Sequence, residues 1–269
     1  MSTPLVMGVV NVTPDSFSDG GRFPDMEAAV SYARALIAAG ADMLDIGGES
    51  TRPGAEPVAE ADEIARVVPL IQRVRAESQV PISIDTMKPG VARAAVAVGA
   101  SVWNDVTALG FSPGGIEVAA ELGCEVVLMH MQGSPLTMQA APRYDDVVDE
   151  VCSFLEARAE AAMAAGVSRI WLDPGIGFGK RLEHSLALLR HLDRVVALGF
   201  PVLLGISRKS VLRGIDPSAV KADDRLGGSI AGALWGAGQG VAAVRVHDVR
   251  ETVQALKVWG AVSGMHVEG

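Results

Sequence analysis

The stretch Asp45-Ile-Gly-Gly-Glu-Ser-Thr-Arg-Pro-Gly54 decides which fold we expect for this chain. It starts inside an apolar segment, Met43-Leu-Asp-Ile46, which ends abruptly in two glycines. A hydroxyl, an arginine and a proline follow, and a helical pattern begins near Pro57. This order is typical of a buried parallel strand that delivers polar groups to its carboxyl end.

Similar segments recur along the whole chain. They are short, rich in Val, Ile and Leu, and do not alternate, as expected for parallel strands covered on both faces. Helical patterns lie between them, and several stop at a glycine, the usual left-handed cap. The expected strands are Leu5–Val10, Met43–Ile46, Pro81–Asp85, Ser101–Trp103, Glu125–Met129, Arg169–Asp173, Val202–Ile206 and Ala242–Val246. The expected helices are Met26–Ala39, Ile64–Val74, Pro89–Val98, Gly115–Leu122, Asp145–Ala165, Ser185–Leu198, Asp224–Gln239 and Val249–Val262.

Strand–helix units repeated in this way within 269 residues predict a (β/α)8 TIM barrel, with residues 1–269 as a single domain. A doubly wound open sheet is the alternative. It is disfavoured because no Gly-x-Gly-x-x-Gly turn follows the first strand, where the chain reads Gly8-Val-Val-Asn-Val. The longest irregular stretches, 11–24, 52–57 and 132–144, each follow a strand, where a barrel places its functional loops.

Composition narrows the class of protein. Hydrophobic residues make up 49% of the chain, which suffices for a large core, and no apolar run is long enough to cross a bilayer. The net charge of −9 argues against a nucleic-acid partner. The N-terminus lacks the pattern of a signal peptide, and two cysteines are too few for a disulfide framework. We therefore expect a cytoplasmic protein with no membrane partner, whose thiols are reduced and buried.

Polar residues gather at the carboxyl ends of the expected strands, where an apolar core has no structural need for them. One subset suits an anion, because guanidinium forks match phosphate oxygens and neutral donors complete the shell. Its members are Asn11, Thr51, Arg52, Arg245 and His247. The amide oxygen of Asn11 could also hold Mg²⁺, which often binds substrate phosphates together with one or two protein groups.

A second subset suits a flat nitrogen heterocycle. Asp85, Asn104 and Asp173 can accept from ring N–H and amino groups, while Lys209 can donate to a ring carbonyl or nitrogen. Val106 and Met129 are candidates for the apolar walls. A purely structural role remains open for single members, since Asp85 could cap a helix and Asp173 could stabilise a turn. For Asp45 a supporting role is the better interpretation.

The same residues offer two other chemistries. His130, His247 and Asp173 could bind zinc, but no His-x-His or His-Glu-x-x-His spacing is present. Lys209 could form a Schiff base, with Arg208 lowering its pKa. His184, His191 and His266 are expected to be surface or packing residues.

Taken together, these stretches resemble the dihydropteroate synthase family over essentially the whole chain. The resemblance rests on Asn11-Val-Thr-Pro-Asp-Ser-Phe-Ser-Asp-Gly-Gly21, Asp45–Gly54, Ser83-Ile-Asp-Thr86, Asn104-Asp-Val106, Met129-His-Met131, Asp173-Pro-Gly-Ile-Gly-Phe-Gly-Lys180, Ser207-Arg-Lys-Ser210 and Arg245-Val-His-Asp-Val249. The chain departs from many relatives at His184-Ser185, where they carry an asparagine.

The resemblance implies a homodimeric transferase of folate biosynthesis. Such an enzyme joins 6-hydroxymethyl-7,8-dihydropterin diphosphate to 4-aminobenzoate and releases pyrophosphate, with Mg²⁺ and no organic cofactor. Sulfonamides imitate the aminobenzoate and compete for its site. Loops Val12–Phe23 and Thr51–Pro57 are implied to close over the reacting centre, with Asp19 and Arg52 pairing there.

Site residues carry over from the family by position. The pterin would meet Asp85, Asn104, Val106, Met129, Asp173 and Lys209. The diphosphate would meet Asn11, Thr51, Arg52, Arg245 and His247, with Asn11 as the metal ligand. The aminobenzoate would meet Phe17, Thr51, Pro53, Phe178, Lys209 and Ser210. The catalytic set would be Asp19, Arg52, Asp85, Asp173 and Lys209.

Two competing functions differ in what they require. A catalytically silent pterin-binding paralogue would be expected to lose diphosphate or loop residues, and this chain keeps them. A pterin-dependent methyltransferase would share the carboxylates but needs no diphosphate pocket, so Arg52, Arg245 and His247 count against it. Early loss of diphosphate through a pterin cation also fits a chain with no visible triad or activated cysteine.

Overall fold

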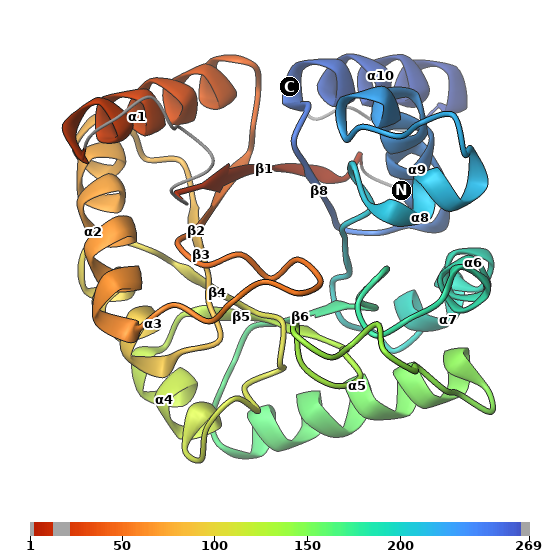
Figure 1. Cartoon of the computed structure of the whole chain (residues 1–269), viewed down its shortest axis with the longest axis horizontal. Helices are drawn as coiled ribbons and strands as arrows, with labels where there is room; N and C mark the ends of the chain where they lie inside the picture. Colours follow the sequence, from red (N-terminus) through yellow and green to blue (C-terminus); the bar gives the residue numbers. More distant parts are fainter. Residues whose placement is uncertain (1–2, 13–21, 265–269) are drawn as a thin grey trace.

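The computed structural model describes residues 3–12 and 22–264. Its eight strands are parallel and follow the order β6-β5-β4-β3-β2-β1-β8-β7. A parallel bridge between Leu172 and Val202 joins the two ends of this sheet, so the strands form a closed ring. Figure 1 shows the helices arranged around that ring. The prediction of a (β/α)8 barrel is confirmed.

The strands are β1 (Leu5–Asn11), β2 (Met43–Gly47), β3 (Ile82–Asp85), β4 (Val102–Asp105), β5 (Glu125–Met129), β6 (Ile170–Asp173), β7 (Leu203–Leu204) and β8 (Ala243–Val246). The helices are α1 (Arg22–Ala38), α2 (Glu60–Glu77), α3 (Pro89–Ala97), α4 (Gly115–Leu122), α5 (Val147–Ala164), α6 (Leu182–Arg190), α7 (Leu192–Val196), α8 (Ser210–Ile215), the 3₁₀ turn η1 (Asp223–Arg225), α9 (Leu226–Gln239) and α10 (Val249–Ser263). No helix of residues 3–12 and 22–264 combines the length and apolarity of a membrane span.

Two predictions about the elements were wrong in detail. The helix expected over Ser185–Leu198 is divided, because His191 leaves the helical region (φ −112°, ψ 33°) and separates α6 from α7. After β7 the structure has a further short helix, α8, which was not among the predicted helices. These changes leave the positions of the strand ends unaffected.

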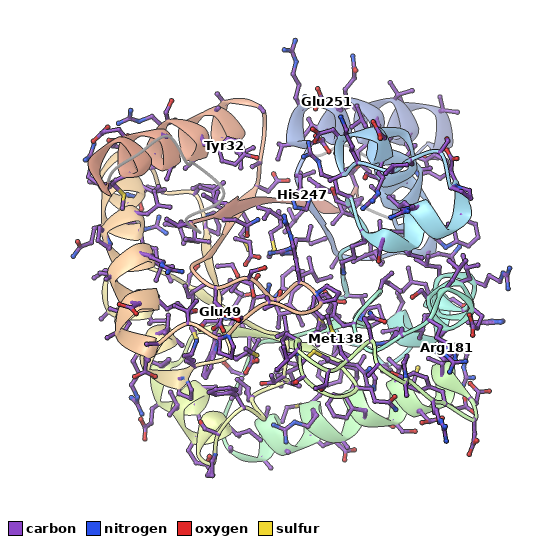
Figure 2. All side chains as sticks on the ribbon, in the orientation of Figure 1. Tyr32, Glu49, Met138, Arg181, His247 and Glu251 are labelled. Carbon is purple, nitrogen blue, oxygen red and sulfur yellow. The ribbon has the colours of Figure 1, made fainter. Side chains whose placement is uncertain are left out.

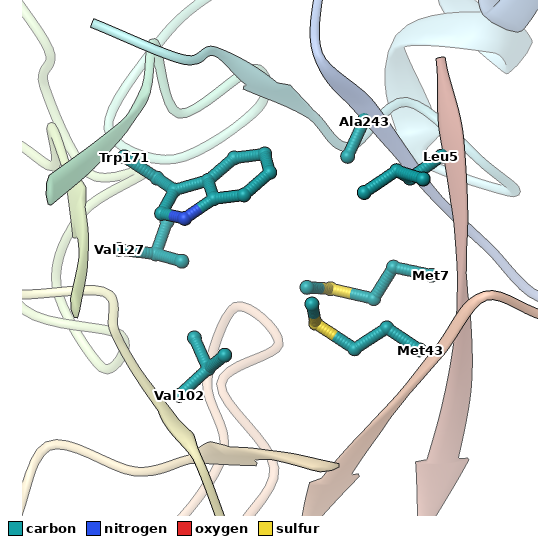
Figure 3. A pocket seen from close by; sticks show the side chains of 7 residues that line it. All are labelled: Leu5, Met7, Met43, Val102, Val127, Trp171 and Ala243. Carbon is teal, nitrogen blue, oxygen red and sulfur yellow. The ribbon is translucent and has the colours of Figure 1, made fainter. Parts of the chain in front are cut away.

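Apolar side chains close the amino end of the barrel. Met7, Met43, Val102, Val127, Leu203 and Ala243 form a buried cluster, against which Trp171 packs. Figure 3 shows these residues, apart from Leu203, pointing toward one another together with Leu5. The cavity left between them is about 10 Å³, at the lower limit of the space that one water molecule needs. This end of the barrel is therefore packed shut.

Side chains alternate along each strand, and this alternation determines which residues lie above the apolar cluster, which forms the floor of the barrel interior. Met43 and Ala243 belong to the floor, so the residues two positions further along their strands, Asp45 and Arg245, also face the interior. The next inward position on the second of these strands is His247. A charged layer thus follows the apolar floor toward the carboxyl ends of the strands. The sheet register therefore brings the polar strand ends to one place.

Candidate active site

An ionic network centred on Arg245 occupies the interior of the barrel. Its Nε donates to Asp45 Oδ2 at 2.6 Å, and its Nη2 donates to Asp85 Oδ2 at 2.8 Å. Asn104 Nδ2 donates to the same Asp45 carboxylate at 3.3 Å. Burial alone would lower the pKa of Arg245, but the two carboxylates outweigh it and raise that pKa. The sequence grouped Arg245 with the anion set; the structure pairs it with Asp85, which was assigned to the heterocycle, and with Asp45, which was given a supporting role.

Asp85 retains unused capacity to accept a hydrogen bond. Its Oδ1 is buried and has no hydrogen-bond partner among the described residues. Burial raises the pKa of Asp85 to about 7, and the neighbouring charge of Asp45 adds to this effect. A buried acceptor without a donor is costly, so a ligand N–H at this point would be stabilising.

Lys209 and Asp173 form the other side of the interior. Lys209 Nζ donates to the carbonyl of Ile176 at 2.7 Å, and Asp173 Oδ1 accepts from Gly175 N at 2.7 Å. A Cβ at Gly205 would lie 3.4 Å from Lys209 Nζ and 3.9 Å from Asp173 Oδ2, so both groups converge over that glycine. A methyl group at this position would make ordinary van der Waals contact with both of them.

Burial lowers the pKa of Lys209 to about 8, with the charge of Asp173 acting in the opposite direction. Burial also raises the pKa of Asp173. The expectation that Arg208 would lower the pKa of Lys209 was wrong. The guanidinium of Arg208 is engaged with Asp248 and Asp223 instead.

An apolar wall lies beside this polar set. Met87, Val106 and Met129 form a small buried cluster, and Met131 and Phe178 pack against it. Lys209 Nζ lies 4.8 Å from the centroid of the Phe178 ring, within the range of a cation–π contact. The predicted wall residues Val106 and Met129 are thus brought together next to the predicted polar residues.

The loop after β6 is fixed by a buried lysine. Lys180 Nζ lies 2.9 Å from His130 Nδ1 and donates to the carbonyls of His130 and Phe178 at 3.1 and 3.0 Å. Burial, together with the charge of Lys180, lowers the pKa of His130 to about 3, so this imidazole is neutral. Both side chains hold the loop that carries Phe178.

The remaining predicted anion ligands lie nearer the mouth. Asn11 ends β1, and Thr51 and Arg52 lie on the loop after β2, where Arg52 is exposed. His247 Nδ1 lies 3.1 Å from Ser207 Oγ. Burial lowers the pKa of His247 to about 3, with help from the positive charges of Arg245, Arg208 and Arg52.

The residues assigned to aminobenzoate are only partly covered. Pro53 and Ser210 are exposed at the mouth, and Phe178 is half-buried. The loop containing Pro53 reaches across to the loop after β5, because Gly54 N donates to the carbonyl of Pro135 at 3.1 Å. Phe17 and Asp19, with most of the Val12–Phe23 loop, lie outside the described residues.

The sequence analysis did not identify a buried ion cluster at the base of the Thr51–Pro57 loop. Lys88 Nζ contacts Glu49 Oε2 and donates to Glu63 Oε2 at 2.6 Å. Glu49 Oε1 in turn accepts from Val58 N at 3.2 Å, so one side chain ties both ends of the loop. Figure 2 shows Glu49 and His247 inside the ring of helices. The sequence did contain one indication of this cluster, because Lys88 lies three residues beyond Asp85, near the end of a predicted strand.

The two histidines considered as zinc ligands each have a protein partner at one ring nitrogen. His130 Nδ1 is engaged by Lys180 and His247 Nδ1 by Ser207. Within residues 3–12 and 22–264, no three His, Cys, Asp or Glu side chains are grouped so that they could hold a metal ion.

Comparison with known proteins identifies the family. Residues 7–247 match the family described as pterin binding enzyme. The chain is 47% identical over 263 residues to a dihydropteroate synthase of Escherichia coli K12, an alignment that covers 96% of this chain and 91% of the relative.

Solved structures agree with this match. A dihydropteroate synthase of Xanthomonas albilineans with 4-aminobenzoic acid superimposes with a TM-score of 0.91 at 50% identity, over 98% of this chain and 94% of the other. A structure from the same organism in complex with 7,8-dihydropteroate gives a TM-score of 0.88 at 47% identity, over 98% and 95% of the two chains. The chain belongs to the pterin-binding enzyme family. The relatives it resembles within that family are dihydropteroate synthases.

Proposed function

We propose that this chain is a transferase of folate biosynthesis that condenses 6-hydroxymethyl-7,8-dihydropterin diphosphate with 4-aminobenzoate to give 7,8-dihydropteroate and pyrophosphate. The single observation that carries the proposal is the buried acceptor Oδ1 of Asp85, which lacks a partner in the described residues. It lies in a barrel interior that also holds Asp173 and the Lys209 ammonium. Because a pterin presents N–H and amino donors along one edge and acceptors elsewhere, it satisfies such an array.

The pterin is bound by Asp85, Asn104, Asp173 and Lys209. Asn104 directs its Nδ2 to Asp45, which leaves its carbonyl oxygen for a ligand. Val106 and Met129 supply the apolar surface for the flat ring. Arg245 lies within this layer, so its guanidinium contributes positive charge beside both the ring and the leaving diphosphate.

The diphosphate is bound at the mouth by Asn11, Thr51, Arg52 and His247. A neutral His247 can donate one hydrogen bond to a phosphate oxygen, and Arg52 is free of ion pairs within the described part of the chain. Mg²⁺ fits this donor set because Asn11 offers a neutral oxygen, and the ion ordinarily takes its remaining ligands from phosphate and water. When bound, the ion would neutralise charge on the leaving diphosphate.

The reaction breaks the bond between the pterin methylene and the diphosphate oxygen, and the electron pair leaves with pyrophosphate. The cation that remains on the pterin is stabilised by the carboxylates of Asp85 and Asp173. The amine of 4-aminobenzoate then forms the new C–N bond and loses a proton. Closure of the Thr51–Pro57 loop over the centre excludes water, which would otherwise capture the cation.

The aminobenzoate lies between Phe178, Pro53 and Lys209, with its carboxylate toward Ser210. Sulfonamides share its shape and charge and compete for the same contacts. We further propose that the chain forms a homodimer and works in the cytoplasm.

The test is pyrophosphate release by the purified chain. Release that needs the pterin diphosphate, Mg²⁺ and 4-aminobenzoate together, with formation of dihydropteroate, supports the synthase. Release without 4-aminobenzoate means that water captures the cation and places the second substrate site in doubt. Pterin binding without any release favours a catalytically silent paralogue, and methyl transfer to or from a pterin favours the methyltransferase.

A further inference from the structure

Every polar group of Arg208, in its main chain and its side chain, makes a hydrogen bond. None of its partners is a residue that we assign to substrate binding. Its Nε donates to Asp248 Oδ2 at 3.0 Å and its Nη2 to Asp248 Oδ1, a bidentate pair, while Nη1 donates to Asp223 Oδ1 at 2.8 Å. Its backbone N–H donates to Ser229 Oγ at 2.9 Å, and its carbonyl accepts from Arg225 Nη1 at 2.8 Å. A residue held from both its main chain and its side chain cannot adjust its conformation freely.

The backbone at Arg208 is strained. Its φ of +59° lies in the left-handed region, which costs free energy for any residue other than glycine unless surrounding contacts impose it. The five hydrogen bonds described above are those contacts. Strain of this kind persists only where the surrounding structure imposes it, and it occurs most often at active sites and ligand-binding sites.

The two neighbours of Arg208 both serve the site. Ser207 Oγ lies 3.1 Å from His247 Nδ1 and accepts from His247 N at 3.2 Å. Lys209 Nζ reaches into the barrel to the carbonyl of Ile176. Arg208 itself points the other way, to Asp248 at the start of α10. The left-handed conformation at Arg208 therefore directs its own side chain toward α10, while the side chains of Ser207 and Lys209 point toward the site.

We propose that Arg208 is a positioning residue, which clamps the loop after β7 to the start of α10 and so aims Lys209 at the pterin. This inference rests on the proposed function, because it concerns how one pterin ligand is held. The bidentate pair with Asp248 carries the clamp, since that carboxylate side chain is only 15% exposed. The pair with Asp223, which is 82% exposed, contributes little.

The test is a double-mutant cycle on pterin binding. Arg208→Lys keeps the positive charge and the same backbone demand but cannot hold Asp248 bidentately. Affinity for 6-hydroxymethylpterin, which lacks the diphosphate, is measured by calorimetry for the wild type, Arg208→Lys, Lys209→Met and the double variant. Asp223→Asn is the matched control, because it removes the exposed partner of the same guanidinium. Thermal unfolding confirms that each variant is folded.

In the wild-type background, Arg208→Lys is expected to weaken pterin binding on the order of tenfold. In the Lys209→Met background the same change is expected to weaken binding less than about twofold, because the effects of two residues that act through one another are not additive. Asp223→Asn is expected to bind like the wild type. An equal loss in both backgrounds, no loss at all, or an equal loss in Asp223→Asn would overturn the role of Arg208. If Arg208→Lys does not fold, Ser229→Ala replaces it in the cycle, since that change frees the Arg208 N–H without altering charge. A wild-type chain that fails to bind the pterin would instead overturn the proposed function, and this inference with it.

Discussion

Replacement of Asp45 by asparagine tests the ionic network on which the site is built. Asp45 is fully buried and accepts a 2.6 Å hydrogen bond from Arg245 as well as the amide of Asn104. Removing one partner of a buried ion pair typically costs about 3–5 kcal/mol, because the other charge is left without compensation. Arg245 retains Asp85 as a partner, so we expect the lower end, about 3 kcal/mol.

In a chain of this size, 1 kcal/mol shifts Tm by roughly 2–4 °C, so Asp45→Asn should lower Tm by roughly 6–12 °C. Thermal unfolding followed by circular dichroism measures this directly. Asp62→Asn makes the same chemical change at an exposed position of α2, where surface substitutions stay within about 0.5 kcal/mol. If Asp45→Asn loses no more Tm than Asp62→Asn, the network does not stabilise the barrel as described.

Three further outcomes follow from the site. Arg52→Ala should lower turnover well over tenfold, because the loss of one transition-state contact costs about 3 kcal/mol. Its Tm should not change, because the side chain is exposed. Undiminished turnover would remove Arg52 from the mechanism. Asp173→Asn should weaken pterin binding with the fold intact, and calorimetry that returned the wild-type affinity would contradict the assignment. The kcat/KM for the pterin diphosphate should rise with pH through about 7, as Asp85 ionises, and fall through about 8, as Lys209 loses its proton. In Asp85→Asn the acid limb of that profile should disappear; an unchanged limb would mean that another group titrates there.

The sequence was sufficient to predict the barrel because buried parallel strands leave a simple pattern. Short apolar runs that end in polar residues predicted both ends of every strand to within two residues, although β7 (Leu203–Leu204) is much shorter than the expected Val202–Ile206. The break at His191 could not be predicted, since its neighbours Leu192 and Val195 continue the apolar helical pattern and are both buried. The extra helix α8 has six residues, too few for a periodic signal.

The sequence predicted which residues gather at the carboxyl ends of the strands, but not how their side chains pair. The strand ends identified Asp85, Asn104, Asp173 and Lys209 because parallel strands bring their carboxyl ends together. The pairing of Arg245 with Asp45 depends on which side chains face inward at the same level across the barrel. That level is set by the stagger of strands far apart in the sequence, and it therefore required the structure.

The most direct measurement of the central claim is a crystal structure of the chain with the pterin substrate bound. We expect the pterin ring against Val106 and Met129, with one of its N–H donors within about 3 Å of Asp85 Oδ1, the typical length of such a bond. A pterin bound elsewhere, with Asp85 Oδ1 still without a donor, would contradict the account.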